Sequence, residues 1–235
     1  MMKLILCALL AFAPAVLTAP QYQVGQRSFY VPPSGPPAIP HPACFQTGAS
    51  TSYTTGSVNT TGAGAVIVTI SGFVVSSTNV TVTDNFDSTT LTNLTVGTQS
   101  TGSVLSWEAP STTSTTATFT IASAGIYAYV CVLPITGVSG VYDGNASYGA
   151  YSGSTCVPGT ITPGSGNHMV VTGFATSSGT TYTLSSPYTI AGQTAYSGAV
   201  TIGGGAGYYA TGASTGPSWG GTATTGDTCS IASWH

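Results

Sequence analysis

The stretch IYAYVCVL at residues 126–133 decides the fold class of this chain. Its residues are apolar at successive positions, so both faces of an extended strand would be apolar here. Such a strand belongs in a protein interior, covered on both sides. The run AVIVTI at residues 65–70 has the same character. Two runs of this kind predict a β-sheet protein whose central strands are enclosed by apolar layers.

Alternating segments accompany these two runs. In NVTVTD, at 79–84, the valines fall on one face and the threonines on the other, and ATFTI, at 117–121, repeats the pattern. Further strands are expected at 168–175, 180–184, 195–202, 207–210 and 228–234. Glycine and serine clusters separate these runs, and helical spacing of apolar residues is not sustained. The pattern predicts an all-β, antiparallel β-sandwich, jelly-roll or Ig-like, with about 10–13 short strands.

Four segments resemble secreted bacterial Ser/Thr/Gly-rich β-sandwich proteins. They are VTVTDN at 80–85, SWEAP at 106–110, TATFT at 116–120 and residues 127–132. The similarity covers about residues 55–235. The resemblance implies a sandwich fold, and it implies no catalytic residues because that group is mostly without assigned function.

Charge is almost missing from the composition. Only 3% of the 235 residues are charged, against roughly 25% in an ordinary globular protein. The two basic residues are Lys3 and Arg27, too few for nucleic-acid binding or a polybasic membrane contact. Hydrophobic residues make up 42% of the chain, so the chain should fold. Since little charge repulsion keeps copies apart, the composition favours self-association.

The N-terminus has the features of an export signal. Lys3 supplies a positive start, the apolar run at 4–12 is too short to span a bilayer, and small residues follow. We expect a signal peptide at 1–18, a Pro-rich extended arm or linker at 19–43 and a β-sandwich domain at 44–235. The arm is either a plain linker or a strand donor to a neighbouring subunit. The expected location is secreted, extracellular or cell surface, with no membrane insertion after signal removal.

Four cysteines remain after signal removal: Cys44, Cys131, Cys156 and Cys229. An even number in an exported protein predicts disulfides, and no C-x2-C pair suggests zinc. Three pairings are possible. We favour Cys131–Cys156, which closes a local loop, together with Cys44–Cys229, which ties the ends of the domain.

Glu108 is the best candidate for a glycosidase carboxylate, because it lies beside Trp107, whose ring could stack on a sugar. It is the only glutamate, and no motif places an aspartate as its partner. The turn from Asp84 to Asp87 is expected to bond its own backbone, although its oxygens could also bind Ca²⁺. We therefore predict no catalytic residue, no metal site and no cofactor.

The histidines and the serine motifs give little indication of a metal site or a catalytic nucleophile. His41, His168 and His235 show no ligand spacing. Two G-x-S-x-G matches, at 212–216 and 216–220, lie in a Gly/Ser-rich stretch where chance matches are expected.

Aromatic residues near turns can stack on sugars, or can cap the core and lie at subunit contacts. The ligand-binding candidates are Trp107, Glu108, Tyr208, Tyr209 and Trp219. Four N-x-S/T sequons mark the glycosylation candidates Asn59, Asn79, Asn93 and Asn145.

These features together favour a non-enzymatic, secreted structural or adhesive protein that associates with itself as a filament or surface layer. Its expected partners are further copies of the chain or extracellular glycans. One alternative is a carbohydrate-binding module that uses loop aromatics. Another is a glycosidase centred on Glu108.

Overall fold

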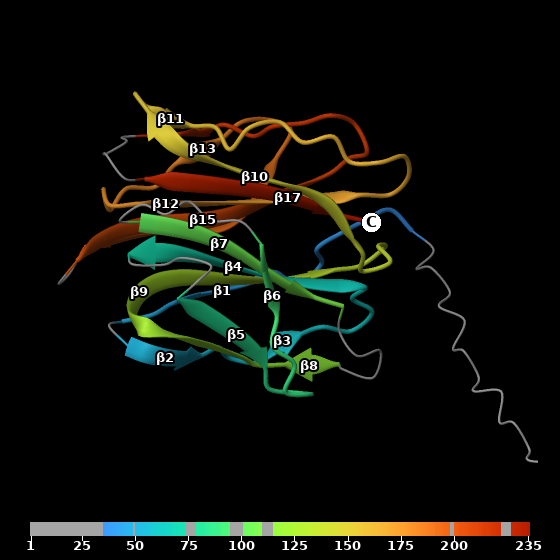
Figure 1. Ribbon diagram of the computed structural model, residues 1–235, viewed down its shortest axis with the longest axis horizontal. Coiled ribbons are helices and arrows are strands. Elements are labelled where there is room, and N and C mark those ends of the chain that lie inside the picture. The colour runs from blue at the N-terminus through green and yellow to red at the C-terminus, as the bar shows by residue number, and fades with distance from the viewer. Residues whose placement is uncertain are drawn as a thin grey trace, which may run out of the picture. The chain divides into compact units, whose positions relative to one another are not determined.

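The computed structural model describes residues 35–48, 50–73, 79–94, 101–109, 115–197, 200–221 and 227–235. Within these ranges every strand pair is antiparallel and no helix occurs, so none is available to cross a membrane. Two large sheets lie face to face (Figure 1). The predicted all-β, antiparallel fold is confirmed, and the facing sheets are consistent with a sandwich. The described ranges contain 17 strands, more than the 10–13 expected, because many of them are only two to five residues long.

The first sheet has the order β1-β9-β4-β7-β6, and β2 and β5 also pair with β9. Its strands are β1 (Ala43–Gln46), β2 (Ser50–Thr54), β4 (Ala65–Phe73), β5 (Val80–Asp84), β6 (Thr92–Leu94), β7 (Thr101–Glu108) and β9 (Phe119–Ile135). A separate pair joins β3 (Val58–Asn59) to β8 (Thr116–Ala117).

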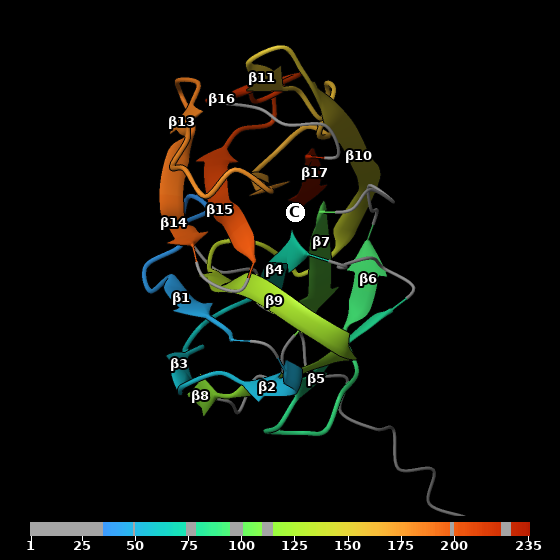
Figure 2. The same cartoon turned by 90° about the vertical axis from the view of Figure 1, so that its left-hand side faces the viewer.

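The second sheet has the order β13-β16-β11-β10-β17-β12-β15-β14. Its strands are β10 (Tyr142–Ser152), β11 (Thr155–Cys156), β12 (Met169–Thr176), β13 (Thr183–Leu184), β14 (Thr189–Ser197), β15 (Thr201–Ala210), β16 (Trp219–Gly220) and β17 (Thr228–Trp234). Figure 2 shows how β11, β13 and β16 lie over one end of this sheet.

Strand β9 connects two layers of the structure. Its first part pairs with β2 and β5, and its second part pairs with β1 and β4. The expected central strand at 126–133 lies in the second part. Val130 and Val132 face one apolar cluster, whereas Cys131 and Leu133 face another. The prediction of a strand covered on both faces is therefore confirmed.

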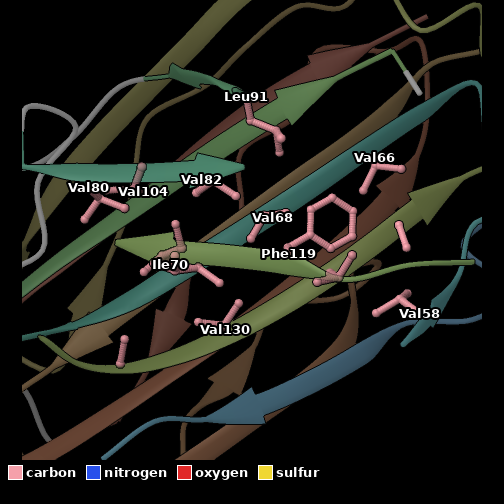
Figure 3. Packing of buried hydrophobic residues seen from close by; sticks show 14 residues of the cluster. Val58, Val66, Val68, Ile70, Val80, Val82, Leu91, Val104, Phe119 and Val130 are labelled. Carbon is pink, nitrogen blue, oxygen red and sulfur yellow. The ribbon is translucent and has the colours of Figure 1, made fainter. Parts of the chain in front are cut away.

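Apolar layers separate the sheets. One layer is rich in valine and lies between β4, β7 and β9 on one side and β5 on the other (Figure 3). A second lies between the two large sheets and includes Ile67, Met169 and Trp234. Two further clusters fill the space under β11, β13 and β16. Since each fully buried aliphatic side chain stabilises by roughly 1.5–3 kcal/mol, these layers hold the sandwich together.

Two glycines set how closely the large sheets approach. A Cβ atom at Gly173 would lie 2.5 Å from the Ser103 hydroxyl, and one at Gly204 would lie 2.8 Å from Ser71 Cβ. The Ser103 hydroxyl bonds the Ser230 hydroxyl across the same interface, at 2.9 Å. At this end of the sandwich the sheets therefore meet through small residues and a polar contact.

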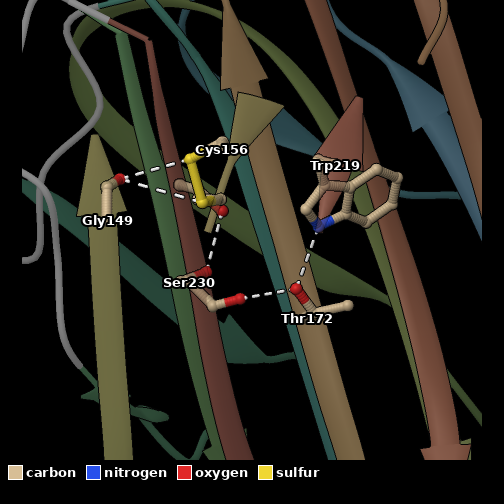
Figure 4. Close-up of a disulfide and its surroundings, with 7 residues drawn as sticks. Gly149, Cys156, Thr172, Trp219 and Ser230 are labelled. Atoms are coloured by element: carbon tan, nitrogen blue, oxygen red, sulfur yellow. Dashed lines mark hydrogen bonds between the residues drawn. A yellow bond between two sulfur atoms is a disulfide. The ribbon is translucent and has the colours of Figure 1, made fainter. Parts of the chain in front are cut away.

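The disulfides join Cys44 to Cys131 and Cys156 to Cys229. The pairing favoured from the sequence is wrong, because it used loop length and chain ends. Cys44 and Cys131 lie directly opposite each other in β1 and β9. Cys156 and Cys229 instead lie in the cluster beyond the second sheet, beside Trp219 (Figure 4). Two disulfides indicate an oxidising compartment.

Several strand boundaries differ from the sequence-based expectation. The segment 195–202 is not one strand: it contains the end of β14 and the start of β15, which pair with each other. Strand β10 was missed, because its residues are mostly glycine, alanine and serine rather than large aliphatic side chains. The sandwich also starts before residue 44, since Ala38 pairs with Thr136 and Ile39 is buried. The predicted signal peptide and most of the predicted arm lie outside the described residues.

Candidate functional site

Strand alternation brings Glu108 and Asp84 together. On β7, Glu108 follows Val104 and Ser106 on the same face. On β5, Asp84 shares a face with Val80 and Val82, and all three are buried. Val104, Val80 and Val82 belong to one apolar cluster (Figure 3). The two carboxyl groups therefore lie at the end of the same layer and face each other across it.

Asp87 completes this carboxylate cluster from the turn after β5. One carboxyl oxygen from each of Asp84, Asp87 and Glu108 lies within 4.8 Å of the others. Asp84 Oδ1 accepts the Phe86 N–H at 2.7 Å, and Asp87 Oδ1 accepts the Thr89 N–H at 2.9 Å. The turn therefore bonds its own backbone as predicted, but these bonds use only one oxygen of each aspartate.

Glu108 is the unusual member of the cluster. It is 6% exposed, and its carboxyl oxygens receive no N–H or hydroxyl donor from the described residues. Its polar contact is with the Asp84 carboxyl, which a protonated Glu108 can hydrogen-bond. Burial first, and then the hydrogen bond and negative charge of Asp84 and the charge of Asp87, together raise the pKa of Glu108 to about 9. Without a cation the carboxyl is protonated at neutral pH, because this pKa lies above 7.

The same burial argues against Glu108 as a glycosidase acid. A glycosidase places its two carboxyl groups across a cleft that admits a sugar. Asp84 and Glu108 are both buried. The cavity of about 210 Å³ beside the turn is lined by Ser57, Asn85, Phe86, Thr116, Ala117 and Thr118, and not by Glu108. Asp84 is the carboxylate partner that no motif revealed, but the pair meets no described sugar-sized opening.

A second polar cluster consists of Asp143, His168 and His235. Asp143 Oδ2 lies 2.8 Å from His168 Nδ1, and Asp143 Oδ1 bonds His235 Nδ1. The register of three neighbouring strands, β10, β17 and β12, brings these residues to one end of the second sheet. They line part of a cavity of about 440 Å³ with Tyr142, Asn145, Thr162, Gly164 and Ser165. Sequence analysis did not reveal this cluster, because its members lie far apart along the chain.

The Asp143 carboxylate is held in its charged form. Burial acts to raise the pKa of Asp143, but contacts from the Ser233 hydroxyl and from the two histidines outweigh burial and hold this pKa below its ordinary value. A carboxylate and two imidazoles can also bind a transition metal. Here both Nδ1 atoms bond Asp143, so hydrogen bonds to Asp143 support His168 and the chain at His235. His168 Nε2 has no hydrogen-bond partner among the described residues.

Acid should weaken this support. Because the folded-state pKa of Asp143 is lowered, its stabilisation is fully present above the unfolded pKa, about 3.9, and is lost as the pH falls through the folded value. We expect Asp143→Asn to be less stable than the wild type at pH 7 and to lose less stability between about pH 5 and pH 3. Urea unfolding at several pH values measures both. Equal pH dependence in the two proteins would contradict the assignment.

The aromatic ligand-binding candidates do not form one surface. Trp219 is 0% exposed, donates its indole N–H to Thr172 at 3.0 Å and packs on Phe174 with ring centroids 4.3 Å apart (Figure 4). Tyr208 and Tyr209 are consecutive residues of β15 and pack against different clusters. Their rings therefore point to opposite faces of the sheet.

Trp107 packs at the edge of the layer between the large sheets, 6.1 Å from the Tyr142 ring. Trp219 cannot present its ring to a glycan in this fold, so its placement on an exposed loop is corrected. Trp219 is a core side chain, whereas Trp107, Tyr208 and Tyr209 are partly buried.

The sequons differ in accessibility. Asn59 is exposed. Asn93 is partly buried and donates its amide to the Val80 carbonyl at 2.7 Å. Asn145, also partly buried, donates to the Thr162 carbonyl at 3.1 Å. Asn79 is partly buried as well. A glycan would therefore be accommodated most easily at Asn59.

The first G-x-S-x-G match lies between β15 and β16, the second ends with the two residues of β16, and no helix follows them in the described ranges. A nucleophile elbow requires a strand followed directly by a helix.

No protein-family model, curated protein or solved structure matches this chain.

Proposed function

We propose that this chain is a secreted, non-enzymatic structural protein that associates with copies of itself through the outer edge of β14. One observation carries this proposal. Among the acidic residues in the described part of the chain, Asp87 is the only one whose side chain is exposed: Asp84, Glu108 and Asp227 are buried, and the Asp143 side chain is 4% exposed. Neither basic residue lies in the described ranges. The surface there is nearly uncharged, so copies meet without repulsion.

Strand β14 supplies the edge. It pairs with β15 on one side, and no described strand pairs with its other side. Natural edge strands are usually shielded by lysine, other charges, proline or bulges. The sequence of β14, TIAGQTAYS, contains no charge and no proline. Its one irregularity lies between Ile190 and Gly192, so the register from Gln193 to Ser197 is regular.

Ile190 allows the edge to be tested. Its side chain is 37% exposed on β14. We expect Ile190→Lys to weaken self-association by about tenfold or more, because it removes apolar contact and places a charge beside the pairing edge. Sedimentation equilibrium of the purified protein gives the association constant.

Val157→Lys is the matched control, since Val157 is 52% exposed and lies just after β11 rather than on β14. It adds the same charge elsewhere and should leave association nearly unchanged. An equal loss in both variants would indicate a general charge effect and would exclude the β14 edge. Unchanged association in Ile190→Lys would exclude it too.

A further inference from the structure

Glu108 presents two buried oxygens that receive no N–H or hydroxyl donor from the described residues, and its one polar neighbour is the Asp84 carboxyl. Burying a carboxylate without a partner costs several kcal/mol, so native structures supply a donor or a cation. The described ranges contain no lysine or arginine that could fill this role. The two nearest ionisable groups, Asp84 and Asp87, are themselves acids. The charge of Glu108 must therefore be removed by a proton or balanced by a cation from solution.

We propose that Asp84, Asp87 and Glu108 form a calcium-binding site. Ca²⁺ binds oxygens at 2.3–2.6 Å, so two oxygens that share one ion lie at most about 5 Å apart. The carboxyl oxygens of the three residues lie within 4.8 Å of one another, which meets this limit. A divalent ion bound among the three carboxylates would also neutralise most of their negative charge at this buried end of the layer.

The remaining ligand positions are consistent with this ion. The backbone bonds of the turn use Oδ1 of Asp84 and Oδ1 of Asp87, which leaves the second oxygen of each for the ion. Glu108 adds two more oxygens, so it can bind in the bidentate manner that Ca²⁺ accepts. Asp87 is exposed, so water can reach the ion and complete its shell.

The donor set selects the kind of cation. It contains only hard carboxylate oxygens and no nitrogen or sulfur, which disfavours zinc and copper. Mg²⁺ requires a near-ideal octahedron at shorter distances, whereas Ca²⁺ tolerates six to eight ligands in irregular arrangements. Because Ca²⁺ does not require an octahedral arrangement of these oxygens, we expect the site to bind Ca²⁺ in preference to Mg²⁺.

An ion at this site would join two elements that are not hydrogen-bonded to each other as strands. Asp84 ends β5, which pairs with β9, while Glu108 ends β7, which pairs with β4 and β6. Binding to the folded state alone raises the unfolding temperature. Bound calcium should therefore stabilise the packing of β5 against β7 across the valine-rich layer.

Thermal unfolding of the purified chain, first freed of metal with EDTA, tests the site. Millimolar CaCl₂ should raise the Tm by about 5–10 °C, and MgCl₂ or ionic-strength-matched NaCl should have much less effect. Titration calorimetry should detect one Ca²⁺ per chain. Asp87→Asn should reduce the Tm shift and weaken Ca²⁺ binding by about tenfold or more. Glu108→Gln should abolish the shift while folding without the metal.

Asp143→Asn is the control, because it removes an acid from the other polar cluster; it should keep the full calcium shift. Asp87 is exposed, so its variant tests the site even if Glu108→Gln fails to fold. The proposal is overturned if the wild type shows no calcium shift or an equal shift with Mg²⁺. An unchanged calcium shift in Asp87→Asn would overturn it as well.

Discussion

Trp219→Ala should lower the free energy of unfolding by about 3–5 kcal/mol, the usual cost of removing a buried aromatic ring. The Trp219 ring is fully buried, packs on Phe174 and donates its N–H to Thr172. Alanine would leave a cavity beside the Cys156–Cys229 disulfide and would also leave the Thr172 hydroxyl without this donor. Urea unfolding followed by far-UV circular dichroism measures the loss.

Two further variants separate the contributions to this loss. Trp219→Phe keeps an aromatic ring but removes the N–H donor, so it should cost about 1–2 kcal/mol. Trp107→Ala removes a half-buried ring and should cost less than Trp219→Ala, because less apolar surface is lost. If Trp219→Ala kept full stability but lost affinity for a glycan, the ring would be a surface ligand platform and the buried position would be wrong.

Replacing Cys156 and Cys229 together by alanine should cost about 4 kcal/mol. The two cysteines are 73 residues apart in the sequence, and the cross-link restricts the unfolded chain over that loop. Both side chains are fully buried, so the variant also loses packing. The double replacement of Cys44 and Cys131, whose separation is 87 residues, should have a similar cost.

Peptide mapping without reduction checks the pairing itself. Proteolysis should release one disulfide-linked peptide pair containing Cys44 and Cys131 and another containing Cys156 and Cys229. Linked peptides that join Cys131 to Cys156 would contradict the fold, since these residues belong to different apolar clusters.

The strands that could be predicted are those whose own sequence requires burial. The apolar run at 65–70 forms the centre of β4, because neither of its faces can be left in water. Strand β10 could not be predicted in this way. Its residues are mostly small or polar, and it is a strand because β17 pairs with it along most of its length. Its conformation therefore depends on a partner about 80 residues away.

The carboxylate cluster was also only partly predictable from the sequence. The turn at Asp84 was predictable from side chains that bond the local backbone. The alternation of β5 was also predicted, and its continuation places Asp84 on the face of Val80 and Val82. What the sequence could not indicate is that β7 lies across from β5, because that depends on how β9 distributes its partners between two layers. The predicted disulfide pairing was wrong for a similar reason. Which cysteines pair depends on the apolar layer in which each cysteine lies, and loop length does not determine this.

The structure shows where the few acidic residues of the chain lie. Its few acids are concentrated in buried clusters or in the turn beside one of them, so almost none remains to shield the surface. This distribution is what links composition to the proposed self-association. A protein that functions as a dispersed monomer would normally keep charges on its exposed edge strands.

Molar mass in solution, measured by size exclusion with light scattering over a wide range of protein concentrations, tests self-association most directly. The proposed function predicts a mass that rises with concentration from one chain towards two and more, and a rise that Ile190→Lys suppresses. A constant mass of one chain at the highest concentration would contradict the structural, self-associating role.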